Sequence, residues 1–174
     1  KDFKTIYAKE KPFNKLIKAP SNLKIQLDKE KTSTMWSDEF YSNSNNLDNF
    51  IYKDTGKLVL KSQKLSRYNL QEKLLFDGTN LISSDDKGNV IVYSTTKRKI
   101  IYKFNFYKKN YKNFEKKLSI ILDNEILYVA DNFGYVYSID YKEKKIIWAK
   151  YFKIPFRSNL KISKDKLFLS DQNN

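Results

Sequence analysis

The chain carries one pattern twice: LFDGTNLISSDDKGNVIVYSTTKRKIIYKFNF at Leu75–Phe106 and ILDNEILYVADNFGYVYSIDYKEKKIIWAKYF at Ile121–Phe152. The copies align without a gap, at an offset of 46 residues. Apolar, turn and aromatic positions coincide, pairing Asp77 with Asp123, Leu81 with Leu127, Asp85 with Asp131, Gly88 with Gly134, Val90 with Val136 and Tyr102 with Trp148. A repeat of this length indicates that one structural unit is built more than once and stacked on itself.

Each copy has the pattern of four short strands. In the second copy, clusters of turn-forming residues separate the candidate strands, which are residues 118–122, 126–130, 135–139 and 145–152. Four antiparallel strands in a period of about 40 to 50 residues are typical of a β-propeller blade. The many Tyr and Phe residues beside only 4 Gly and 3 Pro also favour half-buried strands. We therefore predict an all-β fold, a partial β-propeller of about three to four blades, each a four-stranded antiparallel sheet.

The repeat also divides the chain. We expect residues 1–30 to be an N-terminal lead-in segment and residues 31–174 to be a partial propeller, with repeats near 68–106 and 114–152 and an incomplete one at 156–174. The sequence does not begin with Met, and its last copy stops before the turn glycine of the repeat. For these reasons we expect both ends to be cuts in a longer protein.

The region before the first clear copy is less regular. Residues 3–17 are basic and sparsely apolar, which predicts an extended lead-in strand or an arm. From Trp36 to Leu65 the strand pattern returns, with 49–52 and 58–60 flanking Lys53–Gly56, a sequence typical of a hairpin turn. We interpret this region as a diverged first blade.

The third turn and the outer strand of the second copy carry a known motif. SIDYKEKKIIW at Ser138–Trp148 resembles the tryptophan motif of PQQ-like repeats, A-x-D-x-x-T-G-x-x-x-W. Asp140 and Trp148 stand at the Asp and Trp of that motif, whereas Ser138 replaces its Ala and Glu-Lys replaces its Thr-Gly. In the earlier copy, Tyr102 stands at the Trp position. The resemblance implies a propeller of PQQ-like repeats.

Five residues are expected to define the repeat structurally, namely Gly88, Tyr102, Gly134, Asp140 and Trp148. The large aromatic of the outer strand is expected to dock against the neighbouring blade and to bury about 200 Å² of apolar surface. Removing Trp148 is then expected to cost about 3 to 5 kcal/mol. No residue is expected to be catalytic, to bind a cofactor or to bind a metal.

The composition restricts the chemistry that is available. The chain has no Cys and no His, which excludes disulfides and thiolate chemistry and removes the commonest general base and transition-metal ligand. A formal charge of +14 would favour nucleic acid or an acidic membrane surface as a partner. Only Arg67, Arg98 and Arg157 are arginines, however, the side chain that bidentate phosphate recognition prefers. We interpret most of the charge as lysine spread over solvated strand faces.

Among PQQ-repeat proteins, residues 75–174 are similar to the BamB family, the propeller lipoproteins of the outer-membrane β-barrel assembly machinery. The resemblance implies a non-enzymatic protein-binding scaffold in the periplasm, associated with the outer membrane and without a cofactor. The implied partners are the barrel-assembly insertase and its unfolded substrates, and no nucleic acid. Membrane association is expected only through an anchor or a complex that is not present in this chain.

An enzyme is the first alternative. A PQQ-dependent quinoprotein dehydrogenase would need a carboxylate base, calcium ligands and, in that family, an adjacent cysteine pair, and this sequence has no Cys. Asp85-Asp86 and Asp131-Asn132 could imitate metal ligands, but they stand at turn positions, where such residues cap the backbone.

Two further alternatives are binding modules. YKFNFYKKNYKNFEKK at Tyr102–Lys117 interleaves aromatics with lysines, as single-strand nucleic-acid binders do. Phe114 in this segment recurs as Tyr68 and Phe156, which favours packing for that aromatic. The last alternative is a generic adaptor that binds peptides through its loops or along an open strand edge.

Overall fold

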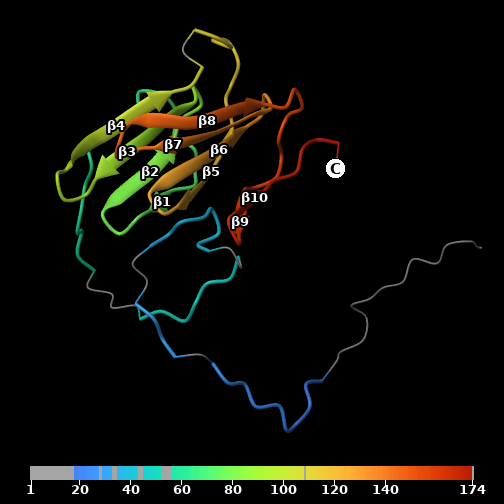
Figure 1. The fold of residues 1–174 in the computed structure, drawn as a ribbon. Coiled ribbons are helices and arrows are strands. Elements are labelled where there is room, and N and C mark those ends of the chain that lie inside the picture. The colour runs from blue at the N-terminus through green and yellow to red at the C-terminus, as the bar shows by residue number, and fades with distance from the viewer. Residues whose placement is uncertain are drawn as a thin grey trace, which may run out of the picture.

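The computed structural model describes residues 18–27, 29–32, 35–42, 45–51, 56–107 and 109–173. Within these residues, ten strands form two four-stranded antiparallel sheets and one hairpin (Figure 1). The first blade contains β1 (Leu75–Phe76), β2 (Asn80–Ser84), β3 (Asn89–Ser94) and β4 (Lys99–Asn105). The second blade contains β5 (Leu118–Asp123), β6 (Ile126–Asp131), β7 (Tyr135–Asp140) and β8 (Lys145–Tyr151). The third unit is the hairpin of β9 (Lys161–Ser163) and β10 (Lys166–Phe168).

These sheets confirm the predicted fold class, an all-β partial propeller of four-stranded antiparallel blades. Each sheet follows the simplest order, in which strands that are consecutive in the sequence are neighbours in the sheet. Among the described residues, no helix is long and apolar enough to cross a membrane.

The two blades repeat each other even in their backbone irregularities. A β-bulge follows Val92 in the first blade and Ser138 in the second. The next turns each contain a residue with a positive φ, Arg98 at 51° and Lys144 at 57°. Both pairs are separated by the same 46 residues as the two sequence copies. The repeat seen in the sequence is therefore one structural unit used twice.

The third unit begins in the same way as the second blade. Asn124 and Glu125, between β5 and β6, have φ values of 45° and 69°. Positive φ at both central residues is the type I′ geometry, whose twist matches that of an antiparallel hairpin. Lys164 and Asp165 repeat it between β9 and β10, with φ values of 47° and 60°. The last hairpin thus has the local structure of the first two strands of a blade.

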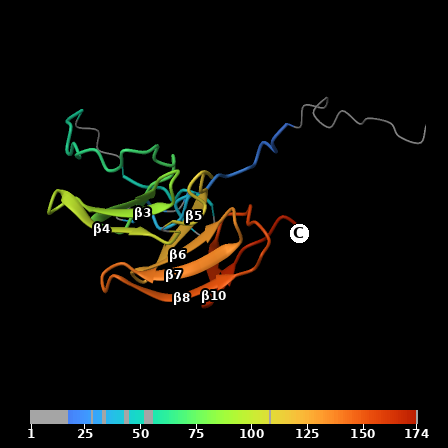
Figure 2. The ribbon, with the colours of Figure 1, turned by 90° about the horizontal axis from the view of Figure 1, so that it is seen from above.

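Figure 2 shows from above that the two blades lie beside each other, and their buried side chains identify the faces that meet. Ile82 of β2 is fully buried in a core that it shares with Leu127 of β6. Tyr128, which lies 46 residues after Ile82, packs instead against a separate core that contains Leu160 beside β9. Each unit therefore turns its equivalent face toward the next one, as stacked propeller blades do.

The region before β1 does not form the strands that the sequence predicts. Residues 49–51 and 58–60 are described outside strands, and most of the predicted turn, 53–55, lies outside the described residues. The predicted arm at 3–17 also lies outside them. Leu58 and Val59 give the physical reason, because they are 80% and 86% exposed. Without a second layer to bury such side chains, little offsets the entropy lost on ordering a strand.

One part of this region is firmly attached to the blades. Residues 36–42, which we call the crossing segment, lie against the first strand of all three units. Its contacts are the backbone pair Trp36–Phe76 (2.7 and 2.8 Å), the hydrogen bond from Leu122 N to Ser37 O (2.8 Å) and the ion pair Lys161–Asp38 (2.6 Å). The crossing segment therefore joins β1, β5 and β9, which are far apart in the sequence.

Candidate functional site

The two glycines of the repeat occupy turns in which a side chain would not fit. Gly88 has a φ of +77°, and a Cβ there would lie 2.5 Å from Cε2 of Tyr107. Gly134 has a φ of +96°, and a Cβ there would lie 2.7 Å from the carbonyl oxygen of Ile154. In both blades a connecting segment crosses the turn closely, which only glycine allows. Both glycines therefore have a structural role, because they let neighbouring segments pack against the turns.

Asp140 and Trp148 make contacts within their own blade, but Trp148 is not buried as expected. Asp140 Oδ1 accepts a hydrogen bond from Glu143 N (2.8 Å) in the turn between β7 and β8. Trp148 is 40% exposed and contacts Tyr128, with 6.3 Å between the ring centroids. Its equivalent Tyr102 is only 8% exposed, because the second blade covers it. The expectation fails because the core around β9 and β10 contains no residue of β8.

Asp85 and Asp131 cap the turns that follow β2 and β6, as their sequence positions predict. Oδ1 of each carboxylate accepts hydrogen bonds from the backbone amides two and four residues later, at 3.0 Å for Asp85 and 2.8 Å for Asp131. Burial raises the pKa of Asp131, and hydrogen bonds from Tyr107 and from the turn amides oppose that shift. In the described part of the chain, no three His, Cys, Asp or Glu side chains gather as metal ligands would.

The aromatics of the lysine-rich segment Tyr102–Lys117 mostly pack inside the fold. Phe106 and Tyr111 stack on rings of the second blade, with centroids 4.5 and 4.4 Å apart. Tyr107 is buried, whereas Phe114 is 61% exposed and packs only through an edge contact with Phe133, with 6.3 Å between the ring centroids. Because most of these rings are already covered, the segment does not present a row of free faces on which bases could stack.

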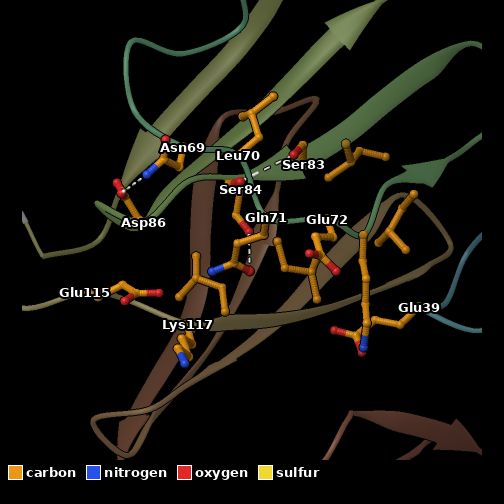
Figure 3. Close-up of a pocket in the computed structure, with 15 residues that line it drawn as sticks. Glu39, Asn69, Leu70, Gln71, Glu72, Ser83, Ser84, Asp86, Glu115 and Lys117 are labelled. Carbon is orange, nitrogen blue, oxygen red and sulfur yellow. Dashed lines mark hydrogen bonds and ion pairs between the residues drawn. The ribbon is translucent and has the colours of Figure 1, made fainter.

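A cleft of about 510 Å³ opens between the first strands of the two blades (Figure 3). Its apolar lining consists of the buried residues Leu75, Ile82, Leu118 and Ile120. Leu70, on the segment that leads into β1, adds a side chain that is 40% exposed. A concave apolar surface with a few polar groups around it is the usual form of a binding site.

Gln71 holds the two walls of the cleft together. Its Nε2 donates to the carbonyl oxygen of Lys116 (2.9 Å), and its Oε1 accepts from Ser84 Oγ (2.9 Å). The hydrogen bond between Gln71 and Ser84 is drawn in Figure 3. Because the amide spans from the first blade to the segment before β5, the cleft is part of the folded structure.

Most charges around the cleft are negative. Its carboxylates belong to Glu39, Glu72, Asp86 and Glu115, and its ammonium groups to Lys73 and Lys117. Asn69 donates to Asp86 Oδ2 (3.3 Å), but the buried Oδ1 of Asp86 has no hydrogen-bond partner among the described residues. A buried acceptor without a donor is costly.

The sequence does not reveal this cleft. Gln71 and its counterpart Lys117 differ in type, and each lies outside the strands, in the segment that leads into the first strand of its blade. A polar residue in a connection gives no periodic signal, unlike the alternating residues of a strand. Only the apolar side chains of the cleft belong to a pattern that the sequence shows.

No protein-family model matches the chain, and no curated protein matches it. Among solved structures, the chain is similar to the crystal structure of BamB from Moraxella catarrhalis. That match has 17% sequence identity and a TM-score of 0.44. It covers 57% of this chain and 28% of that one. The similar part is thus a minority of the length of that protein.

Proposed function

We propose that the chain is a non-enzymatic protein-binding scaffold, and that the cleft between its first two blades is a partner-binding site. The observation that carries this proposal is the cleft itself, in which an apolar lining and a charged rim meet. Protein interfaces combine an apolar centre with a polar rim in the same way.

The charges around the cleft define the chemistry of the partner. Four carboxylates against two lysines favour a segment that carries Lys or Arg beside a large apolar side chain. The apolar side chain would lie beside Leu70, above Leu118 and Ile120, and the basic group would lie near the carboxylates of the rim.

The tryptophan motif at Ser138–Trp148 supports a finer proposal. Through its resemblance to PQQ-like repeats of the BamB type, we place the scaffold in the bacterial periplasm, at the outer membrane. Its partners there would be the insertase that assembles outer-membrane β-barrels and the unfolded substrates of that insertase.

A binding measurement with one matched pair of variants tests the proposal. The purified periplasmic domains of the insertase are titrated onto the immobilised chain, and Kd is compared among wild type, Leu70→Glu and Val59→Glu. Both substitutions add a carboxylate at an exposed apolar position, but only Leu70 lies at the cleft. We expect Leu70→Glu to weaken binding about tenfold, since the lost apolar contact and the cost of burying a carboxylate outweigh its attraction for a basic group.

The control Val59→Glu should bind as the wild type does. Equal loss in both variants would show that the cleft is not the binding site. No binding by wild type would remove the insertase as a partner, and a negative result with unfolded barrel proteins as well would remove barrel assembly from the proposal.

A further inference from the structure

A second hollow, of about 840 Å³, lies at the end of the first blade, around the turn from β2 to β3. Six of its eleven lining residues are cationic: Lys64, Arg67, Lys87, Lys103, Lys112 and Lys116. Among the described residues, no Asp or Glu lines it. It shares no lining residue with the cleft between the blades. The chain therefore has a separate concave surface with a strongly positive potential.

In the described part of the chain, none of the six cations of this hollow takes part in an ion pair, although Asp86 lies close enough to Lys116 to favour its charged form. Lys116 is 2% exposed, and its Nζ donates to the carbonyl oxygens of Tyr111 and Phe114. Burial and the charge of Lys87 lower the pKa of Lys116, while Asp86 opposes the shift. These cations repel one another, and a bound anion would reduce that repulsion.

The base of the hollow is held in place by hydrogen bonds. Asp85 accepts hydrogen bonds from the side chain of Asn89 at 2.8 and 2.9 Å. Asn105 Nδ2 donates to the carbonyl oxygen of Lys87 (2.9 Å). The turn that carries Lys87 is thus fixed to β4, so less conformational entropy is lost when an anion binds.

The aromatic content of the hollow distinguishes between two kinds of anion. Within the described residues, Tyr68 is the only aromatic in the lining. Its ring already faces two cations, with Arg67 at 4.9 Å and Lys87 at 5.9 Å from the centroid. Single-stranded nucleic acid gains much of its affinity from bases that stack on free rings. Five of the six cations are lysines, which are compact point charges, and within this lining only Arg67 could bind a carboxylate or a phosphate with two parallel bonds.

We propose that this hollow binds an acidic polypeptide segment, a short run of Asp and Glu residues in a partner protein. The carboxylates of the segment would lie between Lys87 and Lys103, with Lys64, Arg67 and Lys112 around them. This site has the opposite charge to the cleft between the blades, so the two sites select different segments. It does not depend on the function proposed for that cleft.

A charge-matched pair of double variants tests this inference. The probe is a fluorescein-labelled oligoglutamate peptide, and an oligoglutamine of the same length is the neutral control. Binding to the full chain is measured by fluorescence anisotropy at about 50 and about 150 mM salt. We expect Lys87→Gln with Lys103→Gln to weaken oligoglutamate binding about tenfold at the higher salt concentration.

Lys145→Gln with Lys166→Gln removes the same charge from β8 and β10, outside the hollow, and should change the affinity less than about twofold. Lys87→Arg with Lys103→Arg keeps both charges and should bind as the wild type does, which separates loss of the site from loss of the fold.

Equal losses of affinity in both Gln variants would overturn the proposal, since the binding would then follow net charge. So would tighter binding of an oligodeoxythymidylate of matched charge that depends on the same two lysines, which would make the hollow a nucleic-acid site. Failure of wild type to bind oligoglutamate would overturn it directly.

Discussion

Gly134 lies where the backbone of the segment after β8 passes close to the turn between β6 and β7. Its φ of +96° is rarely adopted by other residues, and the carbonyl oxygen of Ile154 is 2.7 Å from the place of a Cβ. Gly134→Ala must therefore distort the turn or displace the backbone at Ile154. We expect a loss of about 3 kcal/mol in the free energy of unfolding, measured by urea denaturation.

Gly56→Ala is the matched control for this prediction. Gly56 also has a positive φ, +58°, but among the described residues no atom lies within 4 Å of its Cβ position. Its substitution adds only the left-handed strain, for which we expect about 1 kcal/mol. Equal effects at the two glycines would show that the close approach of Ile154 is unimportant.

Tyr102 and Trp148 occupy equivalent positions of the two blades but differ in burial, so their substitutions test how much burial contributes to stability. Tyr102 is 8% exposed and Trp148 is 40% exposed. Tyr102→Ala is expected to destabilise the chain by about 3 to 5 kcal/mol, and Trp148→Ala by about 1 to 2 kcal/mol, because exposed atoms gain little from folding. Urea denaturation of both variants checks the order. A larger loss for Trp148→Ala would mean that its ring is covered in solution.

Between elements, the contact of the β7–β8 turn with the β1–β2 turn makes stability depend on pH. Tyr141 donates its hydroxyl to Asp77 of the first blade. Burial alone would raise the pKa of Asp77, but hydrogen bonds from Asn80, Tyr141 and the amide of Thr79 outweigh it, and the pKa is lowered. The carboxylate therefore adds stability above its unfolded pKa of about 3.9, and that stability is lost as the pH falls through the lowered folded value.

Asp77→Asn removes this titration while keeping an acceptor oxygen. We expect the Tm of wild type to fall more steeply than that of Asp77→Asn between about pH 5 and about pH 3. Tyr141→Phe removes one of the hydrogen bonds that lower the pKa, so its curve should lie between the two. Circular dichroism melts across this range measure all three, and parallel curves for wild type and Asp77→Asn would contradict the prediction.

At the scale of elements, the sequence predicts the strands and turns that recur in its repeat. Strands β5 to β8, the paired turn glycines and the cap at Asp131 follow from the alternation of apolar residues and from turn chemistry. The exposure of Trp148 does not follow, because it depends on which strands lie against β8. The cleft around Gln71 does not follow either, because connections carry no period and their contacts form only when blades meet.

The crossing segment belongs to the scale of the whole molecule. Blades pack mainly on their neighbours, so a repeat array is held together locally. Residues 36–42 are an exception, because they contact β1, β5 and β9, the first strands of successive units. Asp38 is buried, and its Oδ1 also accepts from Phe40 N (3.0 Å). The segment thus adds a contact that no pair of neighbouring blades provides.

The ion pair between Asp38 and Lys161 measures how strongly this segment couples the third unit to the rest. Its Nζ to Oδ2 distance is 2.6 Å, and the Asp38 side chain is only 2% exposed. In a double-mutant cycle of Asp38→Ala and Lys161→Met, followed by urea denaturation, we expect a coupling of about 1 to 2 kcal/mol. The exposed pair Lys142 and Glu125 is the control, with an expected coupling below about 0.5 kcal/mol.

Hydrogen exchange at one amide separates attachment of the segment from simple loss of an ion pair. Leu122 N of β5 donates to Ser37 O, so its protection depends on the crossing segment staying in place. We expect Asp38→Ala to speed exchange at Leu122 while amides inside β6, which bond to neighbouring strands, keep their protection. Unchanged exchange at Leu122 together with a coupling near zero would mean that the segment does not join the units in solution, and that the blades are held by their shared cores alone.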